Sequence, residues 1–236
     1  MPAILAGRRS GPKHPPLPAG AVAFRRRLLA WYGRHRRRLP WRGVRDPYAV
    51  LVSEIMLQQT QVARVMDFFP RFLARYPTLE DLAAAPADAV RESWDGLGYY
   101  ARARNLHAAA RTVVRKLGGR LPRRPEELRA LPGIGRYTAG AVASLAFGAD
   151  VPAVDTNAAR VLARVFAVRG RRKSARRARR LWALAAALVP RGRSADWNQA
   201  LMDLGARYCV ARGPRCGACP VRGSCAIGRR RTARYP

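Results

Sequence analysis

The stretch over residues 131–157, LPGIGRYTAGAVASLAFGADVPAVDTN, constrains the fold of this chain most strongly. A Pro-Gly-Ile-Gly turn separates two helical patterns, one over 125–130 that opens on proline and two glutamates, and an alanine-rich one over 136–147. Two helices joined by so tight a turn form a helical hairpin. Gly133 and Gly135 leave backbone N–H groups uncovered at the start of the second helix. Such a helix end favours an anion, so the sequence predicts a phosphate-binding hairpin over 125–147.

A polar triplet, Asp155-Thr156-Asn157, follows the hairpin directly after an apolar run over 151–154. Taken alone, an aspartate at this place is most simply a helix cap. The order and spacing of the hairpin and the aspartate, however, resemble those of the DNA glycosylase superfamily that includes endonuclease III and the MutY-type adenine glycosylases. In that family the hairpin grips the DNA backbone and the aspartate lies at the sugar. The resemblance implies this role for Asp155.

The charge balance also indicates a polyanionic partner. The chain has 46 lysines and arginines against 14 acidic residues, a formal net charge of +32, and only Lys13, Lys116 and Lys173 are lysines. No apolar run reaches the ~20 residues that span a bilayer, and the N-terminus has no continuous apolar segment typical of a signal peptide. We expect a cytoplasmic, nucleoid-associated monomer without a membrane partner. With the resemblance, the expected partner is double-stranded DNA that contains a mismatch or an oxidised base.

A single carboxylate interrupts a predicted apolar helix in the N-terminal third of the chain. Asp46 and Pro47 predict the start of this helix, and its nearly continuous apolar sequence predicts burial. Glu54, Gln58 and Gln61 have the spacing of an ordinary polar stripe. In the alternative interpretation they line a cleft, and the apolar neighbours 55–57 raise the pKa of Glu54, because ionising a buried carboxyl is costly. Such a carboxyl is a good general acid near neutral pH.

The words SEIMLQQTQV over 53–62 resemble the active-site helix of the MutY-type enzymes. The resemblance implies that Glu54 is the catalytic acid and that Gln59 wedges into the base stack. Tyr137 and Asn157 match family positions that hold the sugar and the two carboxylates in place. The residues that match the family's adenine pocket are Trp41, Arg42, Leu57 and Asp203.

A second motif, GLGYYARARNL over 96–106, places Tyr99 and Tyr100 between a glycine turn and a helix. Both tyrosines could simply pack in the core. The functional interpretation is an aromatic side chain that invades the duplex, with Arg102 at a phosphate beside it. The motif resembles the MutY-type sequence in which one tyrosine of the pair intercalates. The basic run RGRRKSARRARR over 169–180 is typical of a solvated face and is a weaker candidate for DNA contact.

All four cysteines lie near the C-terminus with six, two and five residues between them: Cys209, Cys216, Cys219 and Cys225. Disulfides are disfavoured in a reducing cytoplasm. A structural zinc site usually has two C-x2-C pairs, and this chain has one. The spacing resembles that of the [4Fe–4S] loop of the endonuclease III and MutY-type proteins, and four thiolates suit such a cluster. The resemblance implies a [4Fe–4S] cluster that anchors an arginine-rich loop against DNA.

The resemblance covers about residues 22–228 and implies an all-α, two-lobed HhH-GPD DNA glycosylase fold with a DNA cleft between the lobes. The expected lobes are a six-helix barrel over 46–149 and a cluster lobe made of 21–45 plus 150–228, with the iron–sulfur loop over 209–225. We expect a flexible Pro-rich, basic tail over 1–20 and a basic tail over 229–236.

The implied reaction is hydrolysis of the N-glycosidic bond of adenine paired with 8-oxoguanine or guanine. Endonuclease III has an attacking lysine at the position of Tyr137, and tyrosine cannot form a Schiff base, so a monofunctional glycosylase is expected. A thymine or uracil mismatch glycosylase is the alternative, since such enzymes share the hairpin, the tyrosine and the cluster. A non-catalytic iron–sulfur DNA-binding protein is a third. The usual MutY-type C-terminal domain that inspects the opposite base is not expected here.

Overall fold

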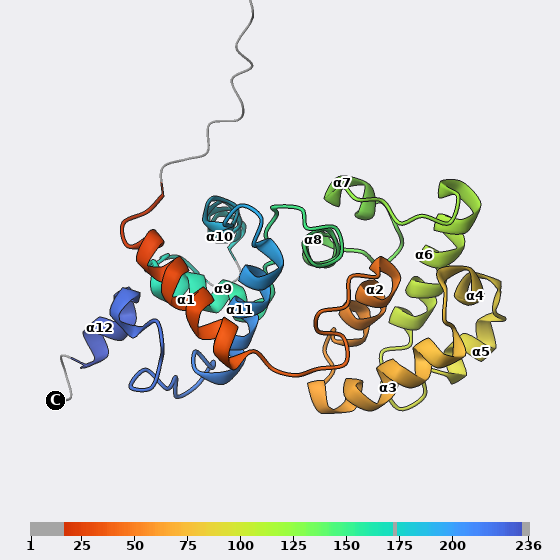
Figure 1. The fold of residues 1–236 in the computed structure, drawn as a ribbon, viewed down its shortest axis with the longest axis horizontal. Helices are drawn as coiled ribbons and strands as arrows, with labels where there is room; N and C mark the ends of the chain where they lie inside the picture. Colours follow the sequence, from red (N-terminus) through yellow and green to blue (C-terminus); the bar gives the residue numbers. More distant parts are fainter. Residues whose placement is uncertain (1–16, 172–173, 233–236) are drawn as a thin grey trace, which may run out of the picture.

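Within the residues that the structure describes, the chain is built of helices only. A computed structural model describes residues 17–171 and 174–232 and has no β-strand in these ranges (Figure 1). The predicted all-α class is therefore confirmed. The predicted tails fall largely on residues 1–16 and 233–236, which lie outside the described residues.

The helices follow one another in the order α1 (Ala21–His35), α2 (Pro47–Met56), α3 (Val62–Arg75), α4 (Leu79–Ala84), α5 (Ala87–Glu92), α6 (Ala101–Leu117), α7 (Pro125–Leu128), α8 (Arg136–Leu145), α9 (Thr156–Val165), α10 (Ala175–Leu188), α11 (Ser194–Arg207), the 3-10 turn η1 (Arg222–Ser224) and α12 (Ala226–Thr232).

Local chemistry explains where several helices begin and end. The Asp46 side chain caps α2 by accepting hydrogen bonds from the backbone N–H groups of Tyr48 and Ala49. Thr78 and Asp81 form a reciprocal capping box at the start of α4. Gly118 ends α6 in the left-handed conformation that glycine adopts without strain.

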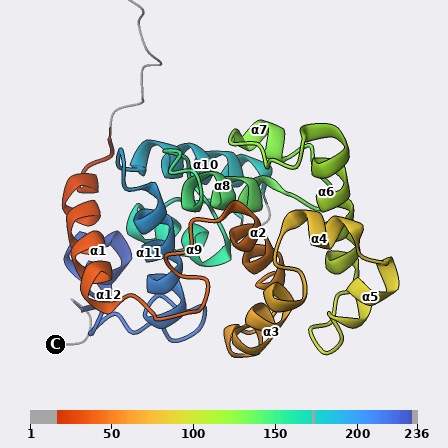
Figure 2. The same ribbon diagram turned by 45° about the vertical axis from the view of Figure 1, so that its right-hand side comes forward.

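The described buried side chains form two hydrophobic clusters. The first contains residues of α2–α8, and the second contains residues of α1 and α9–α11 together with Val221. Trp94 and Trp197 are each fully buried, one in each cluster. Trp41, which the prediction grouped with α1, packs in the first cluster. Figures 1 and 2 show α3–α6 at one end of the molecule and α1 and α12 at the other.

Helix α8 joins the two clusters, because it packs against α2 and α7 on one side and against α11 on the other. Its residues 138–144 are all buried. The Asn198 side chain of α11 donates to the Ser144 hydroxyl at 2.9 Å and accepts from the Ala153 N–H at 3.0 Å. The Arg136 guanidinium stacks 4.0 Å over the Trp182 ring of α10. These contacts fix both ends of α8 against helices of the second cluster.

The basic run over 169–180 is partly helical, since α10 begins inside it at Ala175. The Ser174 hydroxyl caps this helix by accepting from the Arg177 N–H. Leu181, Ala185 and Leu188 recur on one face of the helix and are buried, while Arg176, Arg179 and Arg180 are exposed. Charged residues on a solvated face therefore do not stop the helix. No helix in the described part of the chain has the length and apolarity that crossing a bilayer requires.

Candidate active site

Glu54 is a buried carboxyl in the last turn of α2, where it is 5% exposed. The helix ends at Met56, so Gln58 and Gln61 do not continue its face. The interpretation of these residues as an ordinary polar stripe is therefore wrong. Nine of the ten residues of α2 are buried, which confirms the burial predicted from its apolar sequence.

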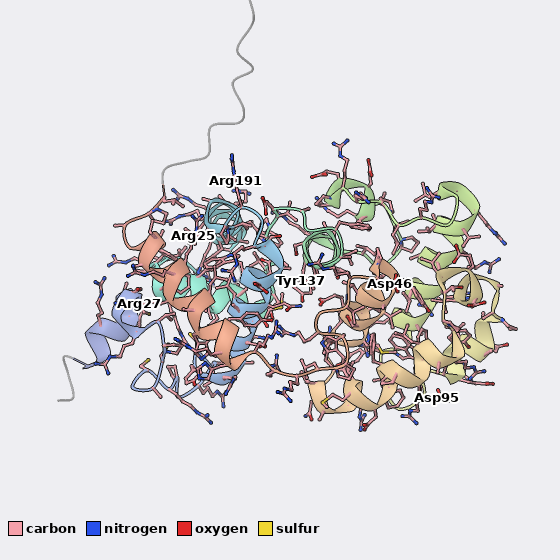
Figure 3. All side chains as sticks on the ribbon, in the orientation of Figure 1. Arg25, Arg27, Asp46, Asp95, Tyr137 and Arg191 are labelled. Carbon is pink, nitrogen blue, oxygen red and sulfur yellow. The ribbon has the colours of Figure 1, made fainter. Side chains whose placement is uncertain are left out.

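The Tyr137 hydroxyl donates a hydrogen bond of 2.6 Å to Glu54 Oε2. Tyr137 lies in the first turn of α8, at the boundary between the helices of the first hydrophobic cluster and those of the second (Figure 3). Burial raises the pKa of Glu54 to about 7, and the Asp155 charge acts in the same direction. The Tyr137 hydrogen bond and the Arg42 charge oppose this increase. Glu54 can therefore hold a proton near neutral pH, and it can give or take one there.

Asp155 is the N-cap of α9, as its position in the sequence suggested. Its Oδ1 accepts from the Ala158 N–H at 2.6 Å, and its Oδ2 accepts from Asn157 Nδ2 at 2.9 Å. The charge of Asp155 contributes to the raised pKa of both Glu54 and Tyr137, so its carboxylate lies close enough to interact with both side chains. The side chain is only half-buried, in contrast to Glu54. One site thus holds a buried carboxyl and a capped, partly accessible carboxylate.

Asn157 is fixed in turn by the Arg160 guanidinium, which donates to its side-chain oxygen at 2.6 Å. The same guanidinium donates to the carbonyls of Gly205 and Cys209 at 2.9 and 2.6 Å. A Cβ on Gly205 would lie 2.6 Å from the Asn157 Cβ, so α9 and α11 can pack this closely only with glycine there. A continuous chain of contacts therefore runs from the first cysteine to Asp155.

A pocket of about 650 Å³ lies against Glu54 between the two groups of helices. Pockets that bind small ligands usually measure about 300–1,000 Å³, so a nucleobase-sized group fits. It is lined by α2 and α8 on one side, by α1 and α11 on the other, and by the connecting segment 36–45 that includes Trp41 and Arg42. The other predicted catalytic and adenine-pocket residues do not line this pocket; they are Leu57, Tyr137, Asp155, Asn157 and Asp203.

Asp203 has a different place from the one predicted. It is 0% exposed, and its Oδ1 pairs with the guanidinium of Arg37 at 2.6 Å and with that of Arg42 at 2.9 Å. A ligand in the pocket cannot touch a side chain so enclosed, which corrects its assignment to the pocket wall. Asp203 instead holds Arg42, whose other terminal nitrogen donates to Tyr32 and Gln199. Leu57 likewise packs against the first hydrophobic cluster.

Three exposed non-glycine residues among those described have backbones in the left-handed region that favours glycine: Gln59 at φ 56°, Tyr99 at φ 51° and Ala167 at φ 50°. The first two lie in the segments that are expected to probe DNA. The Tyr99 side chain is 60% exposed and that of Tyr100 is 42% exposed, so the interpretation of the pair as core residues is wrong. The Tyr100 hydroxyl is held by Asp95, a contact that raises its pKa. A strained backbone under an exposed side chain is typical of functional loops.

The prediction that Arg102 meets phosphate at the surface is wrong. Its side chain is turned inward and is 8% exposed. The two terminal nitrogens donate to five backbone carbonyls, those of Ile55, Met56, Gln58, Leu97 and Gly98. A guanidinium so engaged has no donor left for an external anion at these nitrogens.

The hairpin glycines lie at the surface, as predicted. Gly133 and Gly135 are exposed, and Gly135 is the N-cap of α8 without a side-chain hydrogen bond to its first turn. Gly133 has φ 73°, and a Cβ there would lie 2.6 Å from that of Asn105. Helix α8 therefore presents an uncapped N-terminus beside Tyr137, which is a favourable place for an anion.

The four cysteines are free of disulfides and surround one small cavity of about 50 Å³. Burial raises the pKa of Cys219 to about 11, and the three other cysteines act in the same direction. The Gly228 N–H donates to Cys225 Sγ at 3.3 Å, and the Arg164 guanidinium donates to Cys209 Sγ at 3.4 Å. Among the described residues, no group of three or more His, Cys, Asp or Glu side chains could hold a metal ion as it stands.

Sequence reasoning did not single out Tyr32, Gln199, Arg37 or Arg160 as site residues. The first three fix Arg42 and Asp203, and the last fixes Asn157. Tyr32 has the spacing of an ordinary core residue on α1, and the arginines are hidden among many others. Of these four residues, only Gln199 could have been found from the sequence, because it lies one helical turn before the predicted site residue Asp203 on α11.

Replacing Tyr137 with phenylalanine should raise the Glu54 pKa above its wild-type value of about 7. The lost hydroxyl stabilises the ionised carboxylate, so its removal favours the neutral form. The measurement is a titration of the Glu54 carboxyl by isotope-labelled NMR. Tyr100→Phe, at an exposed tyrosine, is the control and should leave the midpoint in place. A midpoint that falls in Tyr137→Phe would contradict the assigned direction of this hydrogen bond.

Comparison with known proteins gives one family and several relatives. Residues 52–186, which include Glu54, Tyr137 and Asp155, match the family model described as HhH-GPD superfamily base excision DNA repair protein. The adenine DNA glycosylase of Rattus norvegicus is 49% identical over 216 residues, which cover 88% of this chain and 42% of that protein. The chain thus spans less than half the length of this relative.

Solved structures agree with the fold. A thermostable thymine-DNA glycosylase superposes with a TM-score of 0.82 at 34% identity, over 89% of this chain and 97% of that one. A trapped covalent intermediate of endonuclease III with DNA gives a TM-score of 0.73 at 26% identity, over 90% of this chain and 98% of that one.

Proposed function

Because the chain belongs to the HhH-GPD superfamily of base excision DNA repair proteins, we propose that it is a monofunctional adenine DNA glycosylase. Its substrate would be adenine paired with guanine or 8-oxoguanine in double-stranded DNA. The observation that carries the proposal is the buried Glu54 carboxyl, which has a pKa of about 7, bonds to Tyr137 and lines a pocket that a nucleobase fits. A DNA-binding protein without catalysis has no use for this arrangement.

Glu54 would protonate the extruded base. An adenine anion is a poor leaving group, so a proton delivered to a ring nitrogen is needed before the glycosidic bond can break. The bond then breaks with its electron pair moving to the base, and Glu54 is left as a carboxylate. Burial favours return of the proton, and the hydroxyl of Tyr137 and the charge of Arg42 limit the cost of the ionised state.

Asp155 would stabilise the sugar after the base departs. Loss of the base leaves positive charge at the anomeric carbon, and a carboxylate beside it lowers the energy of that state, as in glycoside hydrolysis. The Ala158 N–H and Asn157 hold the carboxylate in place. Water then adds to the anomeric carbon and gives its proton to the Glu54 carboxylate, which restores the acid.

The surface around the site suits a bent duplex. The N–H groups at Gly133 and Gly135 would take a backbone phosphate at the start of α8. Gln59 and Tyr99 would enter the base stack, Tyr99 being the more exposed of the two tyrosines. Extrusion of the target nucleotide then brings its base toward Glu54.

Cys209, Cys216, Cys219 and Cys225 would hold a [4Fe–4S] cluster. The four cysteines line one cavity, and the sulfurs of Cys209 and Cys225 accept hydrogen bonds from N–H donors, which supports a thiolate-ligated group at this place. The cluster would act as an anchor for the loop over 209–225, with no part in the glycosidic chemistry. Broad visible absorbance of anaerobically purified protein supports this assignment, whereas a colourless protein that contains zinc would contradict it.

Two observations favour adenine over thymine or uracil as the substrate. The chain is 49% identical to an adenine DNA glycosylase, and Glu54 lines the pocket. A thymine-specific enzyme remains the alternative because a thymine-DNA glycosylase shares the fold with a TM-score of 0.82. Tyr137 supports a monofunctional reaction in either case, since its hydroxyl cannot form a Schiff base with the sugar.

The test is incubation with four duplexes that hold A:8-oxoG, A:G, T:G or U:G, followed by analysis with and without hot alkali. We expect strand breaks at adenine only, and only after alkali, because hydrolysis of the glycosidic bond leaves an intact abasic strand. Breaks confined to thymine or uracil would eliminate the adenine assignment. Breaks before alkali, together with an adduct trapped by borohydride, would eliminate the monofunctional one.

A further inference from the structure

Arg102 lies between two loops that are far apart in sequence, one after α2 and one before α6. One terminal nitrogen of its guanidinium bonds to the end of α2 and the loop that follows it, and the other bonds to the loop before α6. Nη1 donates to the carbonyls of Ile55 at 3.1 Å, Met56 at 2.8 Å and Gln58. Nη2 donates to the carbonyls of Leu97 at 3.2 Å and Gly98 at 2.9 Å.

The two loops carry two of the three described exposed non-glycine residues with left-handed backbones, Gln59 at φ 56° and Tyr99 at φ 51°; the third, Ala167, follows α9. Arg102 bonds to the carbonyl that precedes each of them, that of Gln58 and that of Gly98. The plane of the preceding peptide defines φ, so a bond to its oxygen restrains the unusual angle directly. Strained angles of this kind persist only where the surrounding structure determines them.

The requirement is specific for arginine. The planar guanidinium presents donors in a rigid fork, whereas lysine has one compact ammonium group and cannot span both loops in the same way. The carbonyls of Ile55 and Met56 are also the last ones of α2, where a positive charge is favourable. The guanidinium carbon further lies 5.4 Å from the centre of the Tyr99 ring, within the range of a cation–π contact.

We propose that Arg102 is a positioning residue that joins the Gln59 and Tyr99 loops into one rigid element. The two side chains would then enter the duplex at a fixed spacing. This inference rests on the proposed function, because it assigns a joint task to two residues that we expect to probe DNA. The coupling itself is a property of the free protein and can be tested without DNA.

The first test is hydrogen exchange of Arg102→Lys in the absence of DNA. Peptides over 57–61 and 96–101 should both exchange faster than in the wild type, while peptides of α9–α11 keep their protection. Arg115→Lys is the matched control, since Arg115 lies exposed near the end of the same helix. Faster exchange in one loop only, or in neither, would overturn the proposal.

Should Arg102→Lys not fold, the wild type tests the same idea in mild denaturant. The amides of Gln58 and Leu97 each bond within their own loop, to the carbonyls of Ile55 and Trp94. If one guanidinium closes both loops, these amides should open as a single unit with the same denaturant dependence. Clearly different opening curves for the two amides would refute the coupling.

The second test is a double-mutant cycle on the single-turnover rate of base release. Arg102→Lys should lower the rate at least ten-fold in the wild type, but less than about three-fold when Gln59 and Tyr99 are both alanine, because coupled residues are not additive. Equal losses in both backgrounds would show that Arg102 does not act through these loops. A wild type that releases no base from any duplex would defeat the proposed function and leave the exchange result intact.

Discussion

Glu54→Gln should lower the single-turnover rate of adenine release by about 10²–10⁴-fold, the usual contribution of a positioned general acid. Glutamine has nearly the same shape and can still accept the hydrogen bond from Tyr137, so the pocket should stay intact. It cannot deliver a proton to the base. Affinity for the mismatched duplex should change by no more than a few-fold, because the hairpin and the two probing loops are untouched.

The control for this variant is Glu92→Gln, at an exposed glutamate that ends α5 in the same group of helices. It should retain wild-type turnover. Stability gives an independent check, since the folded pKa of Glu54 is raised above that of the unfolded chain. The native state then loses stability as pH rises toward about 7, and glutamine avoids that loss. Glu54→Gln should therefore be at least as stable as wild type at pH 8, and unchanged turnover in it would refute the acid assignment.

Asp155→Asn is expected to have the second large effect, a loss of at least about 10²-fold in the rate, the scale seen when one preorganised electrostatic partner is removed. Asparagine is also a good N-cap and can accept from the Ala158 N–H, so α9 should keep its start. What is lost is the negative charge beside the anomeric carbon. Single-turnover kinetics at saturating enzyme measure this loss separately from binding.

Asp88→Asn, at an exposed aspartate of α5, is the matched control and should leave the rate unchanged. The charge of Asp155 also raises the pKa of Glu54, so the Asn variant should show a lower Glu54 midpoint. A variant with wild-type turnover, or with an unchanged Glu54 midpoint, would mean that the two carboxyls do not share a site.

Much of the fold could be predicted because local chemistry decides it. Asp46 and Pro47 define the start of α2, Thr78 caps α4, and Gly118 ends α6. Burial of α2 followed from its nearly continuous apolar sequence. Glu54 and Asp155 were identifiable through the resemblance of their surrounding motifs to the MutY-type sequences, since each residue alone also fitted a polar stripe or a helix cap.

The roles of the arginines could not be assigned from the sequence, because the direction in which a side chain points depends on the tertiary structure. Arg102 and Arg104 are two residues apart on α6, yet the first is buried and the second is exposed. Nothing local distinguishes them, since the carbonyls that bind Arg102 come partly from α2, more than 40 positions earlier. Asp203 shows the same limit, because its two arginine partners lie on the segment between α1 and α2.

The dependence of the excision rate on pH tests the central claim most directly, namely that Glu54 gives its proton to the extruded base. The measurement is the wild-type single-turnover rate on an A:G duplex at saturating enzyme, from about pH 5 to pH 9. Since the pKa of Glu54 is about 7, the rate should be highest in acid and fall about ten-fold per pH unit above that midpoint. A rate that does not change across this range, or that already falls about ten-fold per pH unit from pH 5 upward, as an ordinary carboxyl pKa of about 4.3 would give, would contradict the account.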